Sequence, residues 1–192
     1  MGDNRVVLPK TGEPMDPRIR RTRQLLQQAL DKLLKKKDLN DISIQDIAEE
    51  ATVNRATFYD HYADKFELLT CMVGCRFHQL LAERQIQFKR SCSGELTAIV
   101  RGVCDYLTQM QGTNCKRQLE PHMESTIIGA VREILLAGLK QHGSSFAPEM
   151  VAASASWAIY GAAKEWLQTP NRCSPEEIAE TVTTLVSPVL QI

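Results

Sequence analysis

Residues 43–69 of the chain read SIQDIAEEATVNRATFYDHYADKFELL and predict two short helices joined by a tight turn. Ser43 followed by Asp46 resembles a variant capping box, in which side chains and backbone N–H groups satisfy one another where a helix begins. The first short helix is therefore expected over Ile44–Glu50. Asn54 is a favourable N-cap, so a second short helix is expected to begin directly after it.

The second short helix is expected to run to about His61 and to have two different sides. Val53 and Phe58 are apolar and are expected to pack inward. The outward side carries hydrogen-bond donors and small residues: Arg55, Ala56, Thr57 and Tyr59. A longer amphipathic helix is expected over residues 18–36, where apolar residues recur at helical spacing. Two short helices braced by a longer one are the layout of a helix-turn-helix DNA reader.

Helical spacing of apolar residues continues to the end of the chain. Asp64 caps a helix that is expected to reach Lys89, and residues 112–121 are expected to form a loop or a broken helix. Further helices are expected at residues 96–110, 127–139, 149–167 and 174–190. The predicted fold class is therefore all-α, with about nine helices and no sheet. The predicted regions are a flexible tail (1–17), a first domain (18–66) and a second domain (67–192).

The charge of the chain is zero overall but strongly positive in one place. With 192 residues and no net charge, the protein has no global field that would attract nucleic acid or an anionic membrane. Residues 17–37 nevertheless carry a net charge of +7. Lys35–Lys37 are also explained as cations that complement a helix dipole at its C-terminal end. That explanation does not suit cations at the start of a helix, namely Arg18, Arg20, Arg21 and Arg23.

The cysteines and the apolar stretches indicate a cytoplasmic protein. Six cysteines lie in the chain and no secretory signal precedes them, because the first 16 residues are polar and contain Pro9 and Pro14. We expect free thiols in a reducing cytoplasm. The most apolar stretch, Met150–Ala163, is too short to span a bilayer and is interrupted by serines, so no membrane partner is expected.

Three motifs resemble the tetracycline-repressor (TetR) family of bacterial regulators. They are Ser43–Ala51 (SIQDIAEEA), Val53–Tyr62 (VNRATFYDHY) and Asp64–Leu69 (DKFELL). The resemblance extends from residue 18 to about residue 70 and is specific, because spacing, caps and core positions agree together. The rest of the chain resembles the family only in being helical.

The resemblance implies an N-terminal three-helix helix-turn-helix DNA-binding domain and a C-terminal helical ligand-binding and dimerisation domain. It implies a homodimer that binds double-stranded, palindromic operator DNA and releases it when an unknown small-molecule effector enters the second domain. No cofactor is expected. No enzyme is expected either, because the chain has no nucleophile elbow, phosphate loop, zinc-protease signature or paired carboxylates. A helical adaptor, or an activator without ligand-released repression, stays as an alternative.

The resemblance also assigns DNA contacts at the matching positions. Arg55 has a forked guanidinium that suits guanine O6 and N7. The expected base contacts are Gln45, Arg55, Ala56 and Thr57. Phosphate contacts set the register of a protein on DNA rather than the sequence read. The expected phosphate contacts are Ser43, Tyr59, His61 and Lys65.

Four neighbouring positions have a second interpretation or depart from the family pattern. Tyr62 is expected in the core of the first domain rather than against phosphate, and His61 is equally well explained as a cap of its helix. Thr52 stands where many relatives have glycine. Because a β-branched residue is costly at positive φ, we expect the turn to adopt another conformation. Asp60 would repel phosphates and is expected to point sideways, toward a basic side chain.

The second domain carries weaker signals. Small residues crowd the helix over 149–167, which with the last helix is expected to form half of a four-helix dimer interface; an internal helix of a monomer is the alternative. Six residues are expected to line an effector cavity, although residues of these types at helical spacing are equally typical of plain core. They are Cys104, Tyr106, Met110, Met123, Trp157 and Tyr160. Cys71, Cys75 and His78 share one helical stripe. A metal site or a thiol switch is the alternative to plain core there, but three ligands from one helix make a poor metal site and buried cysteine behaves as a small hydrophobe, so no metal is expected.

Overall fold

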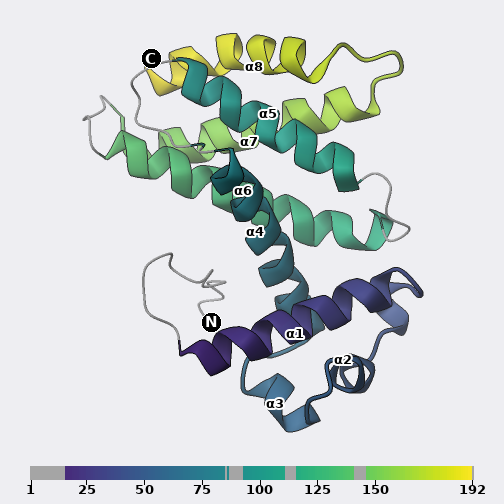
Figure 1. Ribbon diagram of the computed structural model, residues 1–192. Coiled ribbons are helices and arrows are strands. Elements are labelled where there is room, and N and C mark those ends of the chain that lie inside the picture. Colours follow the sequence, from purple (N-terminus) through teal and green to yellow (C-terminus); the bar gives the residue numbers. More distant parts are fainter. Residues whose placement is uncertain (1–15, 85, 87–92, 111–115, 141–145, 192) are drawn as a thin grey trace. The chain divides into compact units, whose positions relative to one another are not determined.

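The structure is a computed structural model that describes residues 16–84, 86, 93–110, 116–140 and 146–191, with only the backbone at 116–122. All regular structure in these ranges is helical, which confirms the all-α prediction (Figure 1). The elements are α1 (Pro17–Leu34), the 3-10 turn η1 (Leu39–Asp41), α2 (Ile44–Glu50), α3 (Arg55–Tyr59), α4 (Lys65–Glu83), α5 (Ser93–Met110), α6 (Lys116–Leu139), α7 (Pro148–Gln168) and α8 (Pro175–Leu190). Nearly all of the predicted N-terminal tail lies outside the described residues.

The chain divides into two compact units, and the division falls inside α4, between Gly74 and Cys75. Unit 1 contains the described residues up to Gly74 and the beginning of α6 up to Met123. Unit 2 contains the second half of α4, helix α5, the rest of α6, and helices α7 and α8.

Unit 1 is built on the apolar stripe of α1. Leu26, Ala29, Leu30 and Leu33 are buried, and their spacing of three and four residues places them on one side of the helix. Helix α1 packs against α2, and α2 packs against α3 (Figure 1). The three helices thus present α2 and α3 on a common small core, as the helix-turn-helix prediction requires.

Local side-chain caps set the ends of these short helices. Ser43 and Asp46 form the predicted capping box, in which each side chain accepts a hydrogen bond from the other residue's backbone N–H. The Asn54 side chain accepts from the Ala56 N–H at 2.9 Å and begins α3. Helix α2 is too short to be stable alone, so these caps and its packing define where it lies.

The turn between α2 and α3 corrects one prediction. Thr52 has φ of 56°, so the turn keeps the left-handed conformation that glycine favours and places a β-branched residue in it. The Val53 N–H donates to the Ala48 carbonyl and the Thr52 N–H donates to the Glu49 carbonyl, both at 3.0 Å. This is the hydrogen-bond pattern of a Schellman motif. Because it satisfies two end carbonyls of α2, the motif holds Thr52 in a conformation that the residue alone disfavours.

Thr52→Gly is expected to stabilise unit 1 by roughly 0.5–1 kcal/mol. The left-handed conformation costs a non-glycine residue about 1–2 kcal/mol. Glycine avoids this cost, but its greater freedom in the unfolded chain offsets part of the gain. Chemical denaturation measures the difference. Thr52→Ala is the control, because it keeps the strained backbone and is expected to give no gain. A glycine variant less stable than the wild type would show that the turn is not strained.

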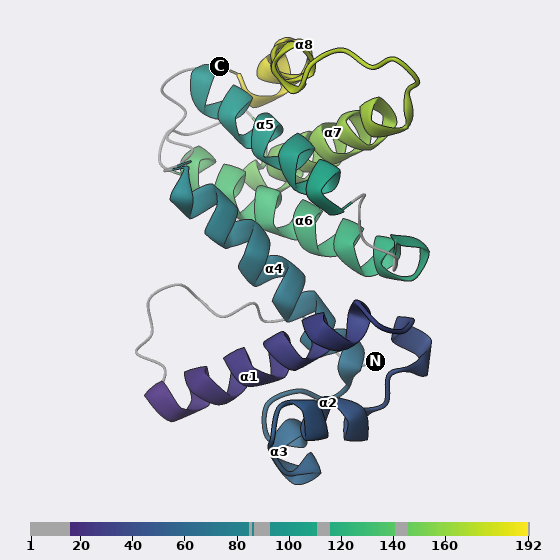
Figure 2. The ribbon, with the colours of Figure 1, turned by 45° about the vertical axis from the view of Figure 1, so that its right-hand side comes forward.

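Unit 2 is a helical bundle in which α5, α7 and α8 pack against one another (Figure 2). The buried side of α5 includes Val100 and Val103, and that of α8 includes Val182 and Val186. At Gly102 a Cβ atom would meet the Leu81 side chain at 2.9 Å, so glycine permits α5 to approach α4 closely there.

Helix α6 corrects a second prediction. It begins at Lys116 and passes through Pro121, where a loop or a broken helix was expected. A single proline removes one backbone hydrogen bond, which a long helix tolerates. The predicted extension of α4 to Lys89 is partly outside the described residues, and the helix ends at Glu83. None of the described helices is both long and apolar enough to cross a membrane.

Candidate DNA-binding surface

Helix α3 separates a buried anchor from an exposed outer side. Phe58 is fully buried, whereas Arg55 and Ala56 are exposed and Tyr59 is 48% exposed. Thr57 is half-buried. The predicted division into inward and outward residues is therefore confirmed for Phe58 and for the exposed residues.

Aromatic contacts fix the buried side of α3. The Phe58 ring lies edge-on to Tyr59, with centroids 5.6 Å apart, and 6.0 Å from the Tyr62 ring. Tyr62 is only 3% exposed, which confirms its prediction as a core residue. Burial raises the pKa of Tyr62, so the phenol stays neutral. The Gln27 amide donates to its hydroxyl at 3.4 Å, and the Arg23 guanidinium lies 5.5 Å from its ring centroid.

Arg55 is held along the outer side of α3 by Tyr59. Its Nη2 donates to the Tyr59 hydroxyl at 3.3 Å, and its guanidinium carbon lies 5.7 Å from the Tyr59 ring centroid. These contacts limit the rotamers of Arg55 before any partner binds, which reduces the entropy lost on binding. Because the hydrogen-bond acceptor is a phenol and not a carboxylate, the positive charge of Arg55 is not neutralised by it.

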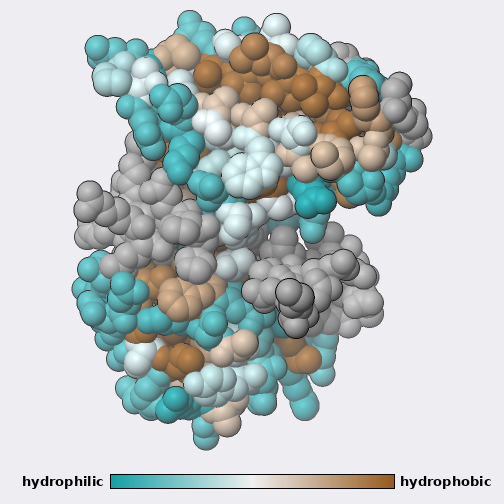
Figure 3. Space-filling model, turned by 180° about the vertical axis from the view of Figure 1, so that it is seen from behind, coloured by the Kyte–Doolittle hydropathy of each residue, from teal (hydrophilic) through white to brown (hydrophobic). Residues whose placement is uncertain are grey.

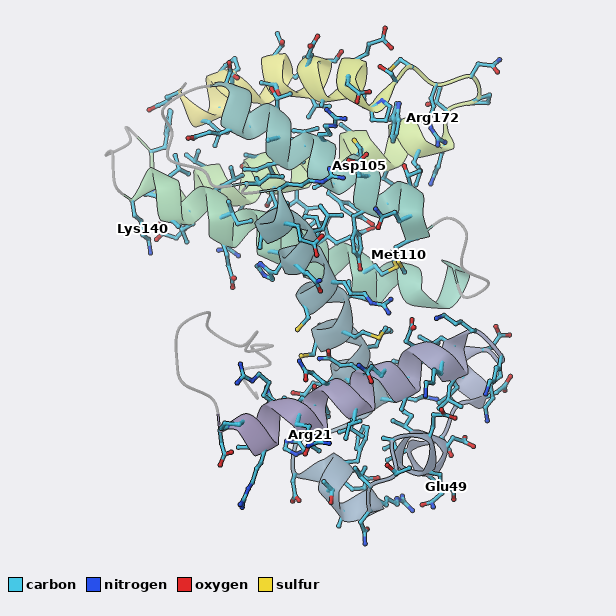
Figure 4. All side chains as sticks on the ribbon, viewed as in Figure 1. Arg21, Glu49, Asp105, Met110, Lys140 and Arg172 are labelled. Carbon is cyan, nitrogen blue, oxygen red and sulfur yellow. The ribbon has the colours of Figure 1, made fainter. Side chains whose placement is uncertain are left out.

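Gln45 lies on the exposed side of α2 and is paired within its own helix. Its amide donates to Glu49 Oε1 at 2.7 Å, one helical turn away. Figure 4 labels Glu49 on α2. A base contact from Gln45 therefore requires its amide to leave or share the Glu49 carboxylate.

Ser43 is occupied by its capping box. Its Oγ donates to Asp46 Oδ2 at 2.7 Å, and Lys37 Nζ lies 3.1 Å from Asp46 Oδ1. The hydrogen bond from the Ser43 backbone N–H is the main reason that the pKa of Asp46 falls to about 2. A carboxyl whose pKa is lowered by folding stabilises the folded state above its ordinary pKa, and this stability is lost as the pH falls toward 2. The capping box is therefore intact at neutral pH.

His61 is half-buried and tends to be neutral. Burial is the main cause that lowers its pKa, and the charge of Arg23 adds to it, while the charge of Asp60 acts in the opposite direction. His61 is thus suited to meet a phosphate as a neutral N–H donor rather than as a cation. Asp60 itself is exposed.

Lys65 points its ammonium group at the backbone of its own unit. The Nζ atom donates to the carbonyl oxygens of Leu39, Asn40 and Ile42 at 2.8, 3.1 and 2.7 Å. The predicted phosphate contact of Lys65 stays a prediction, but these three bonds leave the ammonium without a spare N–H.

Apart from half-buried Arg23 and exposed Lys36, the basic residues of segment 17–37 fall into two groups. Three lysines near its C-terminal end pair with acids: Lys32 with Glu50 at 3.2 Å, Lys35 with Asp31 at 2.9 Å and Lys37 with Asp46 at 3.1 Å. Three arginines in the first turns of α1 are exposed, namely Arg18, Arg20 and Arg21. Figure 4 labels Arg21. The start of α1 therefore offers three exposed positive charges to a polyanion.

The residues predicted to line an effector cavity do not form one group. Cys104, Tyr106 and Tyr160 are buried in unit 2, and burial raises the pKa of both Cys104 and Tyr106 to about 12, so both are uncharged. Met110 is half-buried at the end of α5 (Figure 4). Met123 is buried but belongs to unit 1.

Trp157 differs from the other cavity candidates, because it is 59% exposed and lies at the surface of the chain. The stripe of Cys71, Cys75 and His78 runs across the division between the two units. In the described part of the chain, no three His, Cys, Asp or Glu side chains are placed to hold a metal ion.

Comparisons with known proteins place the DNA-binding surface inside a known domain. Residues 26–70 match the family described as bacterial regulatory proteins, tetR family. Over 60 residues the chain is 52% identical to an uncharacterized HTH-type transcriptional regulator of Bacillus subtilis (strain 168), YxbF. That match covers 31% of this chain and 16% of the relative, so most of both sequences lies outside it.

Solved structures share the fold over nearly the whole chain. The TetR family repressor AlkX from Dietzia sp. strain DQ12-45-1b is similar over 94% of this chain and 98% of its own, with a TM-score of 0.57 and 19% identity. RolR, solved with its ligand resorcinol, is similar over 91% and 93%, with a TM-score of 0.55 and 14% identity. At these identities the likeness is one of fold.

Proposed function

We propose that this chain, whose residues 26–70 match the tetR family of bacterial regulatory proteins, regulates transcription by binding operator DNA as a homodimer. The operator is a palindrome that two copies of α3 read, and a small-molecule effector bound in unit 2 releases it, so that the protein acts as a cytoplasmic repressor. The prediction that the chain is not an enzyme is confirmed, because the family and the relative are described as regulators.

The observation that carries the proposal is the outer side of α3. Fully buried Phe58 anchors the helix, while Arg55 is exposed and held by Tyr59. The side chains of Ala56 and Thr57 are short, so α3 can approach base edges closely in the major groove. We assign base contacts to Gln45, Arg55, Ala56 and Thr57. We assign phosphate contacts to Tyr59, His61 and Ser43, the last of which must share its hydroxyl proton with Asp46 Oδ2.

An exposed apolar stripe on α7 and α8 supports the homodimer. Met150 and Trp157 on α7 are 67% and 59% exposed, and Leu185 and Val189 on α8 are 68% and 42% exposed. Figure 3 shows a broad hydrophobic area on this unit. Apolar side chains gathered in this way mark an interaction surface. Two copies of the α7–α8 pair would cover one another as a four-helix bundle, which also supplies the two-fold axis of a palindrome.

We propose that the effector of unit 2 is mainly apolar. Cys104, Tyr106 and Tyr160 are buried and belong to the same unit. The uncharged state of Cys104 and Tyr106 offers weak hydrogen bonding inside an apolar environment. RolR, which shares the fold, was solved with resorcinol, a ligand of small size.

Selection of duplexes from a random pool tests the proposal. The purified protein is expected to enrich a palindrome whose half-sites lie about 34 Å apart, with two protomers per duplex. Affinity is expected to fall steeply as salt rises, because phosphate contacts release counterions. A pool without enrichment would contradict the proposal. Binding that does not depend on salt would instead favour a helical adaptor.

A further inference from the structure

Lys65, the first residue of α4, uses its ammonium group entirely within unit 1. An ammonium has three N–H donors, and Lys65 Nζ lies within hydrogen-bond distance of three backbone carbonyls, those of residues 39, 40 and 42. The side chain is half-buried, and Nζ lies 5.6 Å from the Phe66 ring centroid. The lysine is therefore packed in place rather than extended into solvent.

The three carbonyls belong to the segment that leads into α2. Residues 39–41 form η1, and Ile42 precedes Ser43, the N-cap of α2. Leu39 is 1% exposed and Ile42 is fully buried, so the segment is anchored on its apolar side. The three carbonyls differ in their backbone bonding, because that of Leu39 also accepts from the Ile42 N–H at 3.2 Å. Lys65 supplies a charged donor to these carbonyls, and thus ties the start of α4 to the start of α2.

The position of α2 matters for the DNA-binding surface. Helix α2 carries Gln45, packs against α3, and joins α3 through the hydrogen-bonded turn at Thr52. A shift of segment 39–42 would therefore move the outer sides of both helices. Helix α4 also continues past Gly74 into unit 2, so Lys65 lies on the element that the two units share.

We propose that Lys65 is a positioning residue for DNA binding: it fixes segment 39–42, and through it α2, and it does not contact phosphate. This inference rests on the proposed function. It replaces the phosphate contact expected for Lys65 from the sequence.

Two substitutions in the full-length chain separate the two roles. Lys65→Met removes the charge, and Lys65→Arg keeps it. A guanidinium binds phosphate well, but its planar fork does not converge on three carbonyls as a compact ammonium does. If Lys65 positions α2, both variants are expected to bind the selected palindrome roughly tenfold more weakly at every salt concentration. The slope of log Kd against log salt is expected to stay at its wild-type value.

The controls exclude a loss of stability as the cause. Affinity is measured per DNA-binding-competent protein, by stoichiometric titration, well below the unfolding temperature of every variant. Hydrogen exchange is expected to rise at the amides of residues 39–46 in both variants and to be unchanged in unit 2. The matched control is Lys35→Met, since Lys35 is an exposed lysine paired with Asp31. This variant is expected to change neither the affinity for the palindrome nor the hydrogen exchange of residues 39–46.

Three results would overturn the inference. In the first, Lys65→Arg binds like the wild type while Lys65→Met lowers the salt slope by about two. That change would mean that each protomer has lost one phosphate contact. In the second, both folded variants bind with wild-type affinity, which would make Lys65 merely structural. In the third, wild-type protein selects no duplex, which contradicts the proposed function itself and is recognised before any variant is made.

Discussion

Arg55→Ala is expected to weaken binding to the selected palindrome by about 30-fold to 20,000-fold, with a much smaller loss on unrelated duplexes. A bidentate arginine–guanine contact is worth roughly 1–3 kcal/mol of discrimination, and the dimer makes it twice. Non-specific affinity comes from phosphate contacts, to which Arg55 contributes only its charge. Fluorescence anisotropy with the palindrome and with a scrambled duplex of equal length measures both losses.

Arg55→Lys is the matched control for this prediction. It keeps the positive charge and loses the fork, so it is expected to retain non-specific affinity while losing most of the discrimination. Arg21→Ala provides the opposite case, because Arg21 is an exposed arginine of α1. Its substitution is expected to weaken binding to all duplexes alike. Equal losses of Arg55→Ala on the palindrome and on the scrambled duplex would refute the base-reading role.

Gly161→Leu is expected to convert the proposed dimer into monomers at micromolar concentration. Gly161 continues the exposed stripe of α7 that contains Ser154, Trp157 and Ala158. A Cβ atom at Gly161 meets nothing within 4 Å in the chain itself, so leucine is compatible with the fold and favours the helix by roughly 1 kcal/mol. In a close four-helix interface the two added side chains would cost roughly 2–6 kcal/mol through overpacking. Sedimentation velocity measures the change.

Gly129→Leu is the control for the dimer prediction. Gly129 lies on α6, and there too an added Cβ atom meets nothing within 4 Å. This variant is expected to sediment as the wild type does. Operator affinity is expected to fall with Gly161→Leu alone, because a monomer holds only one half-site. A Gly161→Leu protein that remains dimeric would exclude the α7–α8 surface as the interface.

The parts of the fold that depend on local sequence were predictable. The starts of α2 and α3 follow from Ser43, Asp46 and Asn54, whose caps involve residues two or three positions away. The burial of Phe58 and Tyr62 follows from helical spacing and side-chain type. These signals need no knowledge of distant contacts, which is why the helix-turn-helix was visible in the sequence.

The parts that depend on distant or backbone partners were not predictable in the same way. The partners of Lys65 are carbonyl oxygens 23–26 residues away, and a backbone carbonyl carries no side-chain signature. The left-handed conformation of Thr52 was missed because the hydrogen bonds of the motif outweigh the preference of the residue. Its residue type predicts Trp157 in a cavity, whereas the structure places it on the exposed side of α7.

A protein–DNA double-mutant cycle tests the central claim that the outer side of α3 reads bases twice. Guanine is replaced by 7-deazaguanine, which lacks the N7 acceptor, at each position of the selected palindrome in turn. One symmetry-related pair of guanines is expected to weaken the wild type strongly and Arg55→Ala hardly at all, with a coupling of about 1–3 kcal/mol per half-site. Losses that simply add at every guanine would contradict the account.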